Sequence, residues 1–323
     1  MTVSPHILHA VSEMKAGSEP VLDRVESMVE VAFDLQKKPK SRQDLIDALY
    51  LYDEALELSK GHPLAEARAW AGRGGALRRM PSAGLEELDE ARSAFTKALE
   101  VLREHGDPEE TAEVEMSLGL VLQALAGSGR AALEHAVQAY HRALRVFTRS
   151  EYPREFATLH NNLATAYLSM KLSPEREVMR EALAVQSFQE ALKVVTLIED
   201  PTEYAMLQNN LGNALQAMRS AHPVENLVRA VEAYDEALKV RTSYDTPVEY
   251  ANTVANKANA LMNLPDDPTR PELGNPKNLV EAMDLLERAR QSYEKHGVLD
   301  RAQIVNELRT ELEAELRAAG GLA

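Results

Sequence analysis

The chain has 323 residues, 45% of them apolar and 27% charged, and its formal net charge is −15. It contains no cysteine, which excludes disulfides, thiolate nucleophiles and cysteine-based metal sites. The acidic balance disfavours a nucleic-acid partner, because phosphate groups are bound by clustered Lys and Arg. The N-terminus lacks a basic region followed by an apolar core, and no apolar run approaches the ~18 residues of a membrane span. We therefore expect a cytoplasmic protein with no signal peptide and no membrane contact.

Residues 1–19 are expected to form an N-terminal arm, either loose or a short helix, and residues 20–38 the first helix of a degenerate opening pair. A recurring block starts in the next helix. It consists of an alanine, an aromatic residue four positions later and a second alanine three positions after that. Its copies are Ala48/Tyr52/Ala55, Ala91/Phe95/Ala98, Ala136/Tyr140/Ala143, Ala184/Phe188/Ala191, Ala230/Tyr234/Ala237 and, in decayed form, Ala282/Leu286/Ala289.

The block returns every 43 to 52 residues, and its i, i+4, i+7 spacing places the three residues on one face of a helix. A fixed block at such a period indicates stacked supersecondary units, each burying its apolar face against the next. The pattern predicts an all-α fold, a right-handed α-solenoid of about six helical hairpins over residues 20–297.

A second helix is expected to follow each block and to begin at a proline. Asp107-Pro108, Asp200-Pro201 and Thr246-Pro247 each place a capping residue before proline, with a glutamate three residues after the cap. This pattern predicts a capping box with proline at the first helical position. The second helix also carries a small residue 21 positions after the second alanine of the block, which indicates a close helix crossing. These residues are Ala76, Gly119, Ala164, Gly212 and Ala258.

Two segments near the C-terminus differ from the repeats. Residues 265–276 are rich in proline and aspartate and are expected to be an exposed connection, either a simple insertion or a loop that contacts a partner. Residues 298–319 are expected to form a capping helix of the same domain, since a terminal repeat must solvate one face. Gly320-Gly321 are expected to end the ordered chain.

The repeats resemble the tetratricopeptide repeat (TPR), in which a helix with Leu-Gly or Leu-Ala precedes a helix with Ala-x3-Phe/Tyr-x2-Ala. Leu211-Gly212 and Ala230/Tyr234/Ala237 show both parts. The period exceeds the usual 34 residues of that family, and the unit looks like the long repeats of kinesin light chains and of bacterial sensor or effector proteins. Asn209-Asn210-Leu211-Gly212-Asn213 looks like the Gly-Asn-Leu-Gly-Asn repeats of spindle-orientation adaptors. The resemblance implies that asparagines on the concave face bind extended peptides.

A polar stripe recurs on these second helices. Asn252, Asn256, Asn259 and Asn263 follow i, i+4, i+7, i+11 spacing, and the two preceding repeats carry asparagine or threonine at matching positions. Asparagine is a poor residue for a helix interior, so a tertiary or binding interaction is expected to offset its cost. The amides bond each other between helices, or bind the backbone of a peptide, or do both. The candidate peptide-binding residues are Thr158, Asn161, Asn162, Thr165, Asn209, Asn210, Asn213, Asn252, Asn256, Asn259 and Asn263.

No catalytic constellation is recognised. The histidines lack metal-ligand spacing, and Gly72-x-Gly74-Gly75 lies inside a helical repeat rather than after a strand, which argues against a phosphate loop. We expect no enzyme activity, no metal and no cofactor. The sequence predicts an adaptor or scaffold that binds an extended segment of a partner protein. The alternative is a regulatory sensor for a small molecule or a short signalling peptide, and the oligomeric state is left open.

Overall fold

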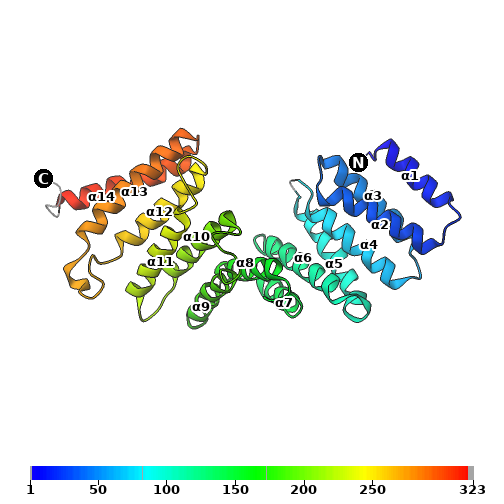
Figure 1. Cartoon of the computed structure of the whole chain (residues 1–323), viewed down its shortest axis with the longest axis horizontal. Coiled ribbons are helices and arrows are strands. Elements are labelled where there is room, and N and C mark those ends of the chain that lie inside the picture. The colour runs from blue at the N-terminus through cyan, green and yellow to red at the C-terminus, as the bar shows by residue number, and fades with distance from the viewer. Residues whose placement is uncertain (1, 82, 172, 319–323) are drawn as a thin grey trace. The chain divides into compact units, whose positions relative to one another are not determined.

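The computed structural model describes residues 2–81, 83–171 and 173–318. These residues form fourteen α-helices and one short 3-10 helix, and they contain no strand (Figure 1). The chain divides into two compact units, Met1–Asn162 and Leu163–Ala323, here called unit 1 and unit 2. The division falls inside α8 (Pro153–Ser169).

Unit 1 is built from helical hairpins in which consecutive helices pack side by side. Its helices are α1 (Pro5–Ala16), α2 (Val21–Lys37), α3 (Arg42–Leu58), α4 (Pro63–Arg78), α5 (Leu85–His105), α6 (Pro108–Ala126) and α7 (Leu133–Ala143). The hairpins are α2 with α3, α4 with α5 and α6 with α7, and α2, α4 and α6 also contact one another in that order. The segment expected as an N-terminal arm contains α1, which packs against α2 and α3.

Unit 2 repeats this arrangement. Its helices after α8 are α9 (Pro174–Ala191), α10 (Pro201–Ala217), α11 (Pro223–Leu238), α12 (Pro247–Met262), η1 (Pro271–Leu273), α13 (Pro276–Lys295) and α14 (Leu299–Ala318). Helix α10 pairs with α11 and α12 with α13, while α14 closes the series on α13. The predicted all-α repeat fold is confirmed. Gly320-Gly321 and residue 319 lie outside the described residues.

The recurring block forms the core of each hairpin. Its alanines are fully buried, and so are the aromatic rings between them. The small residue of the partner helix makes room for the ring: a Cβ added to Gly119 would lie 2.4 Å from Cε1 of Tyr140, and one added to Gly212 would lie 2.5 Å from Cε1 of Tyr234. The predicted close crossing is thereby confirmed at these two positions.

The predicted helix starts are confirmed, but two of the three predicted caps are wrong. Helices α6, α10 and α12 begin at the expected prolines. Only Asp200 caps its helix, accepting from the Glu203 backbone N–H at 3.1 Å. Asp107 makes no cap bond and accepts instead from Nη2 of Arg68 at 3.4 Å. The Thr246 hydroxyl oxygen accepts from the Thr242 N–H at 3.3 Å, so it is turned away from the helix that it precedes.

The connection of residues 265–276 is tied to the helices at both of its ends. The carboxylate of Asp266 accepts from the backbone N–H groups of Lys277 at 3.0 Å and Asn278 at 2.9 Å, so it caps the start of α13 from outside the helix. The amide of Asn275 donates to the Met262 carbonyl at 2.7 Å, at the end of α12. This connection satisfies orphan backbone groups of two helices at once.

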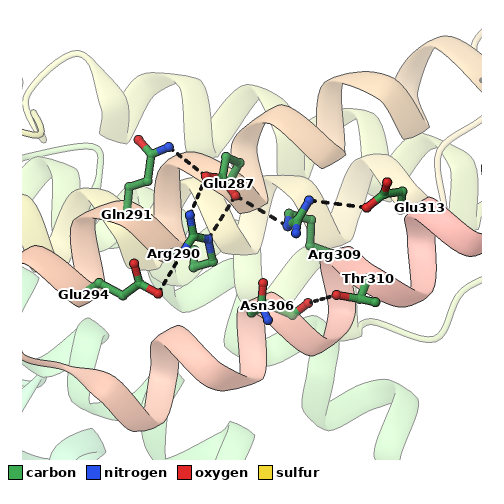
Figure 2. Close-up of polar contacts among 8 residues, drawn as sticks. All are labelled: Glu287, Arg290, Gln291, Glu294, Asn306, Arg309, Thr310 and Glu313. Atoms are coloured by element: carbon green, nitrogen blue, oxygen red, sulfur yellow. Dashed lines mark hydrogen bonds and ion pairs between the residues drawn. The ribbon is translucent and has the colours of Figure 1, made fainter.

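The closing helix α14 is joined to α13 by an ion-pair cluster (Figure 2). Glu287 on α13 accepts from Nη2 of Arg290 at 2.6 Å and from Gln291 at 2.7 Å, and it pairs with Arg309 of α14 at 3.5 Å. The hydrogen bond from Arg290 is the main reason why the pKa of Glu287 falls to about 2. The cluster therefore holds α14 against α13 while Glu287 is ionised.

A buried carboxylate performs a similar task inside unit 1. Glu115 on α6 is 2% exposed, and its Oε1 accepts from Arg103 of α5 at 2.7 Å and from Arg142 of α7 at 2.7 Å. Both arginines reach solvent, so their charges keep part of their hydration. Glu115 therefore cross-links three consecutive helices.

Candidate functional site

The structure places the predicted stripe residues on α8, α10 and α12, in both units. Thr158, Asn161 and Asn162 lie on the part of α8 in unit 1; Thr165 lies on the part in unit 2; Asn209, Asn210 and Asn213 lie on α10; Asn252, Asn256 and Asn259 lie on α12, and Asn263 directly follows it. In unit 2 the stripe continues along α10 and α12.

Unit 2 contains a pocket of about 490 Å³ in which five stripe residues meet. Helix α10 supplies one group of amides, α12 a second, and α13 and α14 close the far side. The lining residues are Asn209, Asn210, Asn213, Arg241, Glu249, Asn252, Asn256, Tyr293, Arg301, Ile304 and Val305. The remaining stripe residues of the unit do not line it.

Asn209 connects α10 to α12 across the floor of this pocket. Its Oδ1 accepts from Nδ2 of Asn256 at 3.3 Å and from the Thr253 hydroxyl at 3.1 Å. The Thr253 oxygen in turn accepts from Nη1 of Arg241 at 2.9 Å. Burial lowers the pKa of Arg241, and Glu249 opposes this shift by its charge. Asn209 is therefore part of a structural network between neighbouring helices.

Asn252 connects α12 to α13 and α14. Its Oδ1 accepts from the Tyr293 hydroxyl at 2.6 Å and from the guanidinium of Arg301. Because a guanidinium only donates, Arg301 fixes which amide atom faces it, and Nδ2 of Asn252 is left on the other side. Asn252 thus ties α12 to both closing helices, and its Nδ2 makes no hydrogen bond within the described residues.

The other amides have spare hydrogen-bonding capacity. Among the described residues, Nδ2 of Asn210, Nδ2 of Asn213 and Oδ1 of Asn256 make no hydrogen bond; Asn213 uses its Oδ1 to accept from Tyr234 at 2.8 Å, and Asn210 only accepts from Asn209 at 3.5 Å. Two donors and one acceptor on adjacent helices match the alternating C=O and N–H groups of an extended peptide backbone.

Asn259 and Asn263 lie outside the pocket. Both are exposed, and Nδ2 of Asn263 donates to the backbone carbonyl of Asn259 at 2.9 Å. The periodicity groups them with Asn252 and Asn256, but the pocket ends before the last turn of α12. Their side chains face solvent.

Sequence reasoning missed the charged and aromatic members of the pocket. Arg241 stands four residues after the second alanine of its block, where earlier repeats carry the buried residues Leu102, Phe147 and Val195. A charged residue at a repeat position that is uncharged in the earlier repeats was the available signal. Tyr293 holds the same position after Ala289. Arg301 and Ile304 gave no signal, because the closing helix has no counterpart in the repeats.

The described residues contain no group of three or more His, Cys, Asp or Glu side chains placed to hold a metal ion. Among the helices of the described part, none has the length and apolar character needed to cross a membrane. The glycines of residues 72–75 lie within α4, where Gly72 and Gly74 make room for the rings of Tyr52 and Phe95. Their role is packing.

No protein-family model matches the sequence, and a search of curated proteins finds no match. Two solved structures share its fold. BtubC (BKLC) from P. vanneervenii is 22% identical with a TM-score of 0.51, over 73% of this chain and 88% of that one. A Signal Transduction ATPase with Numerous Domains protein with a tetratricopeptide repeat sensor, from Pyrococcus horikoshii, is 17% identical with a TM-score of 0.58. That match covers 93% of this chain and 42% of the other.

The long-period helical block, the packing of consecutive helices into hairpins and the two structural likenesses all agree. The chain is a TPR-like repeat protein with an α-solenoid fold.

Proposed function

We propose that this protein is a non-catalytic adaptor or scaffold, and that the pocket of unit 2 binds an extended segment of a partner protein. The observation that carries the proposal is the set of unbonded amide groups on Asn210, Asn213 and Asn256, which face one pocket from two adjacent helices. Such groups bind a peptide backbone without demanding one particular side-chain sequence.

The border of the pocket adds contacts for side chains. Arg301 supplies a positive charge and Glu249 a negative one, while Ile304, which is 64% exposed, offers apolar surface on α14. A bound segment would therefore combine backbone hydrogen bonds with an apolar side chain near Ile304. The net negative charge of the whole chain favours segments of basic or amide character.

The alternative function is a sensor for a small molecule or a short signalling peptide. It is favoured by the fold shared with the tetratricopeptide repeat sensor from P. horikoshii and by a pocket volume of about 490 Å³, within the range of small-molecule sites. The two functions differ in what the pocket retains from a cell extract.

The experiment compares Asn210→Ala with Asn263→Ala. Both replace an asparagine of the stripe by alanine, but only Asn210 lines the pocket. Partners are first captured on the wild-type protein and identified by mass spectrometry, and their affinities for the three proteins are then measured by fluorescence anisotropy. We expect Asn210→Ala to weaken binding by about 1–2 kcal/mol and Asn263→Ala to leave it unchanged.

Melting temperatures of the same variants separate binding from stability. Alanine is the better helix former, and Asn210 lies inside α10, so Asn210→Ala should not unfold at a lower temperature than the wild type. Equal affinity of all three proteins for every captured partner would refute the pocket as the binding site. Thermal stabilisation by a metabolite, with no captured protein partner, would favour the sensor.

A further inference from the structure

Unit 1 contains a second and larger hollow, a groove of about 1050 Å³ along α2, α4 and α6. One wall is the apolar side of α2, where Leu22 is 45% and Phe33 48% exposed. The floor is α4, where Gly75 carries no side chain and the ring of Tyr52 lies against Gly72. Large apolar side chains exposed along a groove of this size indicate a binding surface rather than a packed core.

Three polar groups of this groove make no hydrogen bond within the described residues. They are Nε of Arg78, Oε1 of Gln36 and the hydroxyl of Tyr52, and all three atoms are buried. Arg78 forms no ion pair within the described residues, and burial, followed by the neighbouring charge of Arg79, lowers the pKa of its guanidinium. A buried donor or acceptor without a partner costs about 1–3 kcal/mol, so the occupied groove is expected to supply these partners.

Two other hairpins of the chain contain a tyrosine–glutamine hydrogen bond that the groove lacks. The hydroxyl of Tyr140 donates to Gln123 at 2.9 Å, and that of Tyr234 lies 3.0 Å from Oε1 of Gln216. Gln36 lies on α2, which pairs with the helix of Tyr52 as α6 and α10 pair with those of Tyr140 and Tyr234, yet it makes no bond with Tyr52. The hydrogen bond between a block tyrosine and a glutamine of the paired helix, which forms in two other hairpins, is therefore absent beside the groove.

The opposite end of the groove is acidic. Arg68, near the start of α4, is bound by Glu110 at 2.9 Å and by Asp107 at 3.4 Å, which neutralise its charge. Glu26, Glu30 and Glu113 also line the groove and form no ion pair within the described residues. Desolvation and the neighbouring carboxylates of Glu155 and Glu110 raise the pKa of Glu113. At this end four lining carboxylates, those of Glu26, Glu30, Glu110 and Glu113, outnumber the single arginine, Arg68.

The two ends are a defined distance apart. Helices α2 and α4 run in the same direction, because Arg79 at the end of α4 donates to the carbonyl of Gln36 at the end of α2 at 2.6 Å. From Arg68 to Arg78 the helical rise gives about 15 Å. An extended peptide spans this distance in about four or five residues.

We propose that the groove of unit 1 binds a peptide segment of ordered charge. A carboxylate of the segment pairs with Arg78, and its apolar side chains pack on Phe33 and over Gly75. A Lys or Arg four or five positions away pairs with the carboxylates of Glu26, Glu30 and Glu113. The proposal rests on the protein-interaction function but assigns a second site, on the other unit.

The test is a selection of random dodecapeptides displayed on phage against the immobilised full chain. We expect the selected peptides to share large apolar residues with an acidic and a basic residue four or five positions apart. Arg78→Met keeps an unbranched apolar stem and removes the guanidinium with its charge, and it should weaken their binding about tenfold or more. Arg149→Met, an exposed arginine of the same unit that does not line the groove, is the matched control and should bind as the wild type does.

A double-mutant cycle identifies the partner of Arg78. Replacing the acidic residue of a selected peptide by its amide should weaken binding to the wild type but not to Arg78→Met. Glu30→Gln should show the same coupling to the basic residue of the peptide. Since Arg78 makes no protein bond, Arg78→Met should melt at the same temperature as the wild type or higher.

The outcomes distinguish this site from the pocket of unit 2. Selected peptides that bind Arg78→Met as tightly as the wild type would overturn the groove proposal. If Asn210→Ala weakened the binding of those peptides, they would support the pocket of unit 2 as the binding site. A selection without enriched peptides, or a clear loss of stability in Arg78→Met, would also overturn it. Peptides sensitive to Arg78→Met but not to Asn210→Ala would support the groove alone.

Discussion

Replacing Gly212 by alanine tests whether the block aromatic and the small residue of the partner helix form one packing unit. The new Cβ would lie 2.5 Å from Cε1, 2.8 Å from Cζ and 2.9 Å from Cδ1 of Tyr234. Carbon atoms pack at about 3.5–4.0 Å, so the ring must move by about 1 Å. The ring is fully buried, and its hydroxyl lies 2.8 Å from Oδ1 of Asn213 and 3.0 Å from Oε1 of Gln216, which limits its movement.

Two opposing effects set the magnitude. Alanine gains about 1 kcal/mol over glycine in a helix, while overpacking a core typically costs about 1–3 kcal/mol, with the lost hydroxyl bond adding about 1 kcal/mol. We expect Gly212→Ala to lower the local stability of α10 and α11 by about 1–2 kcal/mol. Gly75→Ala is the control, because its Cβ would meet only the flexible amide of Gln36, at 3.4 Å.

Hydrogen exchange followed by mass spectrometry is the appropriate assay, because repeat proteins open locally and do not always unfold in one transition. Peptides from α10 and α11 should exchange faster in Gly212→Ala, while peptides from α4 serve as an internal reference. In a Tyr234→Leu background the same glycine substitution should become neutral or stabilising, since the ring is gone. An equal loss in both backgrounds would refute the proposed packing.

Three further predictions concern stability. Ala143→Leu should cost about 1–3 kcal/mol, measured by chemical denaturation, because Ala143 is fully buried in its block. Glu115→Gln should lower the free energy of unfolding by about 1–3 kcal/mol, because it removes the negative charge with which Arg103 and Arg142 both pair. Since this carboxylate is buried, high salt should not abolish the difference from the wild type. Glu287, with a pKa lowered from 4.5 to about 2, should stabilise the chain fully above pH 4.5 and lose this contribution as the pH falls toward 2. Solvent screening reduces the contribution to about 1 kcal/mol, and a stability curve of Glu287→Gln parallel to wild type over that range would contradict it.

The fold could be predicted from the sequence because its determinants are local and repeated. Each copy of the block places an aromatic ring between two alanines on one helical face, and a proline sets the start of the next helix. Six copies reinforce one another, so the decayed copy around Leu286 is placed correctly by its neighbours. Gly119 and Gly212 are identified as crossing positions in the same way.

The helix caps could be predicted less well, because a capping side chain can also hydrogen-bond to residues that are distant in the sequence and absent from the local pattern. The carboxylate of Asp107 accepts a hydrogen bond from Arg68, which lies 39 residues earlier on the neighbouring helix. The hydroxyl of Thr246 is taken by the turn that precedes it. In contrast, the cap of α13 comes from Asp266, on the far side of a long connection, where no capping pattern would place it.

The candidate site was predictable in its amides and not in their surroundings. Periodicity groups Asn210, Asn252 and Asn256, and the structure brings these three into one pocket. The periodicity does not reveal that the side chain of Asn252 is bound by Tyr293 and Arg301, which lie 41 and 49 residues away in the sequence. Those partners belong to the decayed last repeat and the closing helix, where the repeat pattern has ended.

The bonds of Asp266 bear on where this chain tolerates engineering. Long surface connections are usually the sites at which proteases cut and at which a tag or a second domain can be inserted. Here Asp266 caps the start of α13 and Asn275 binds a carbonyl at the end of α12, so residues of the connection satisfy backbone groups of both helices. An insertion next to Asp266 would uncap the start of α13, and one next to Asn275 would free the carbonyl at the end of α12, so this connection is a poor position for a tag or a second domain despite its length.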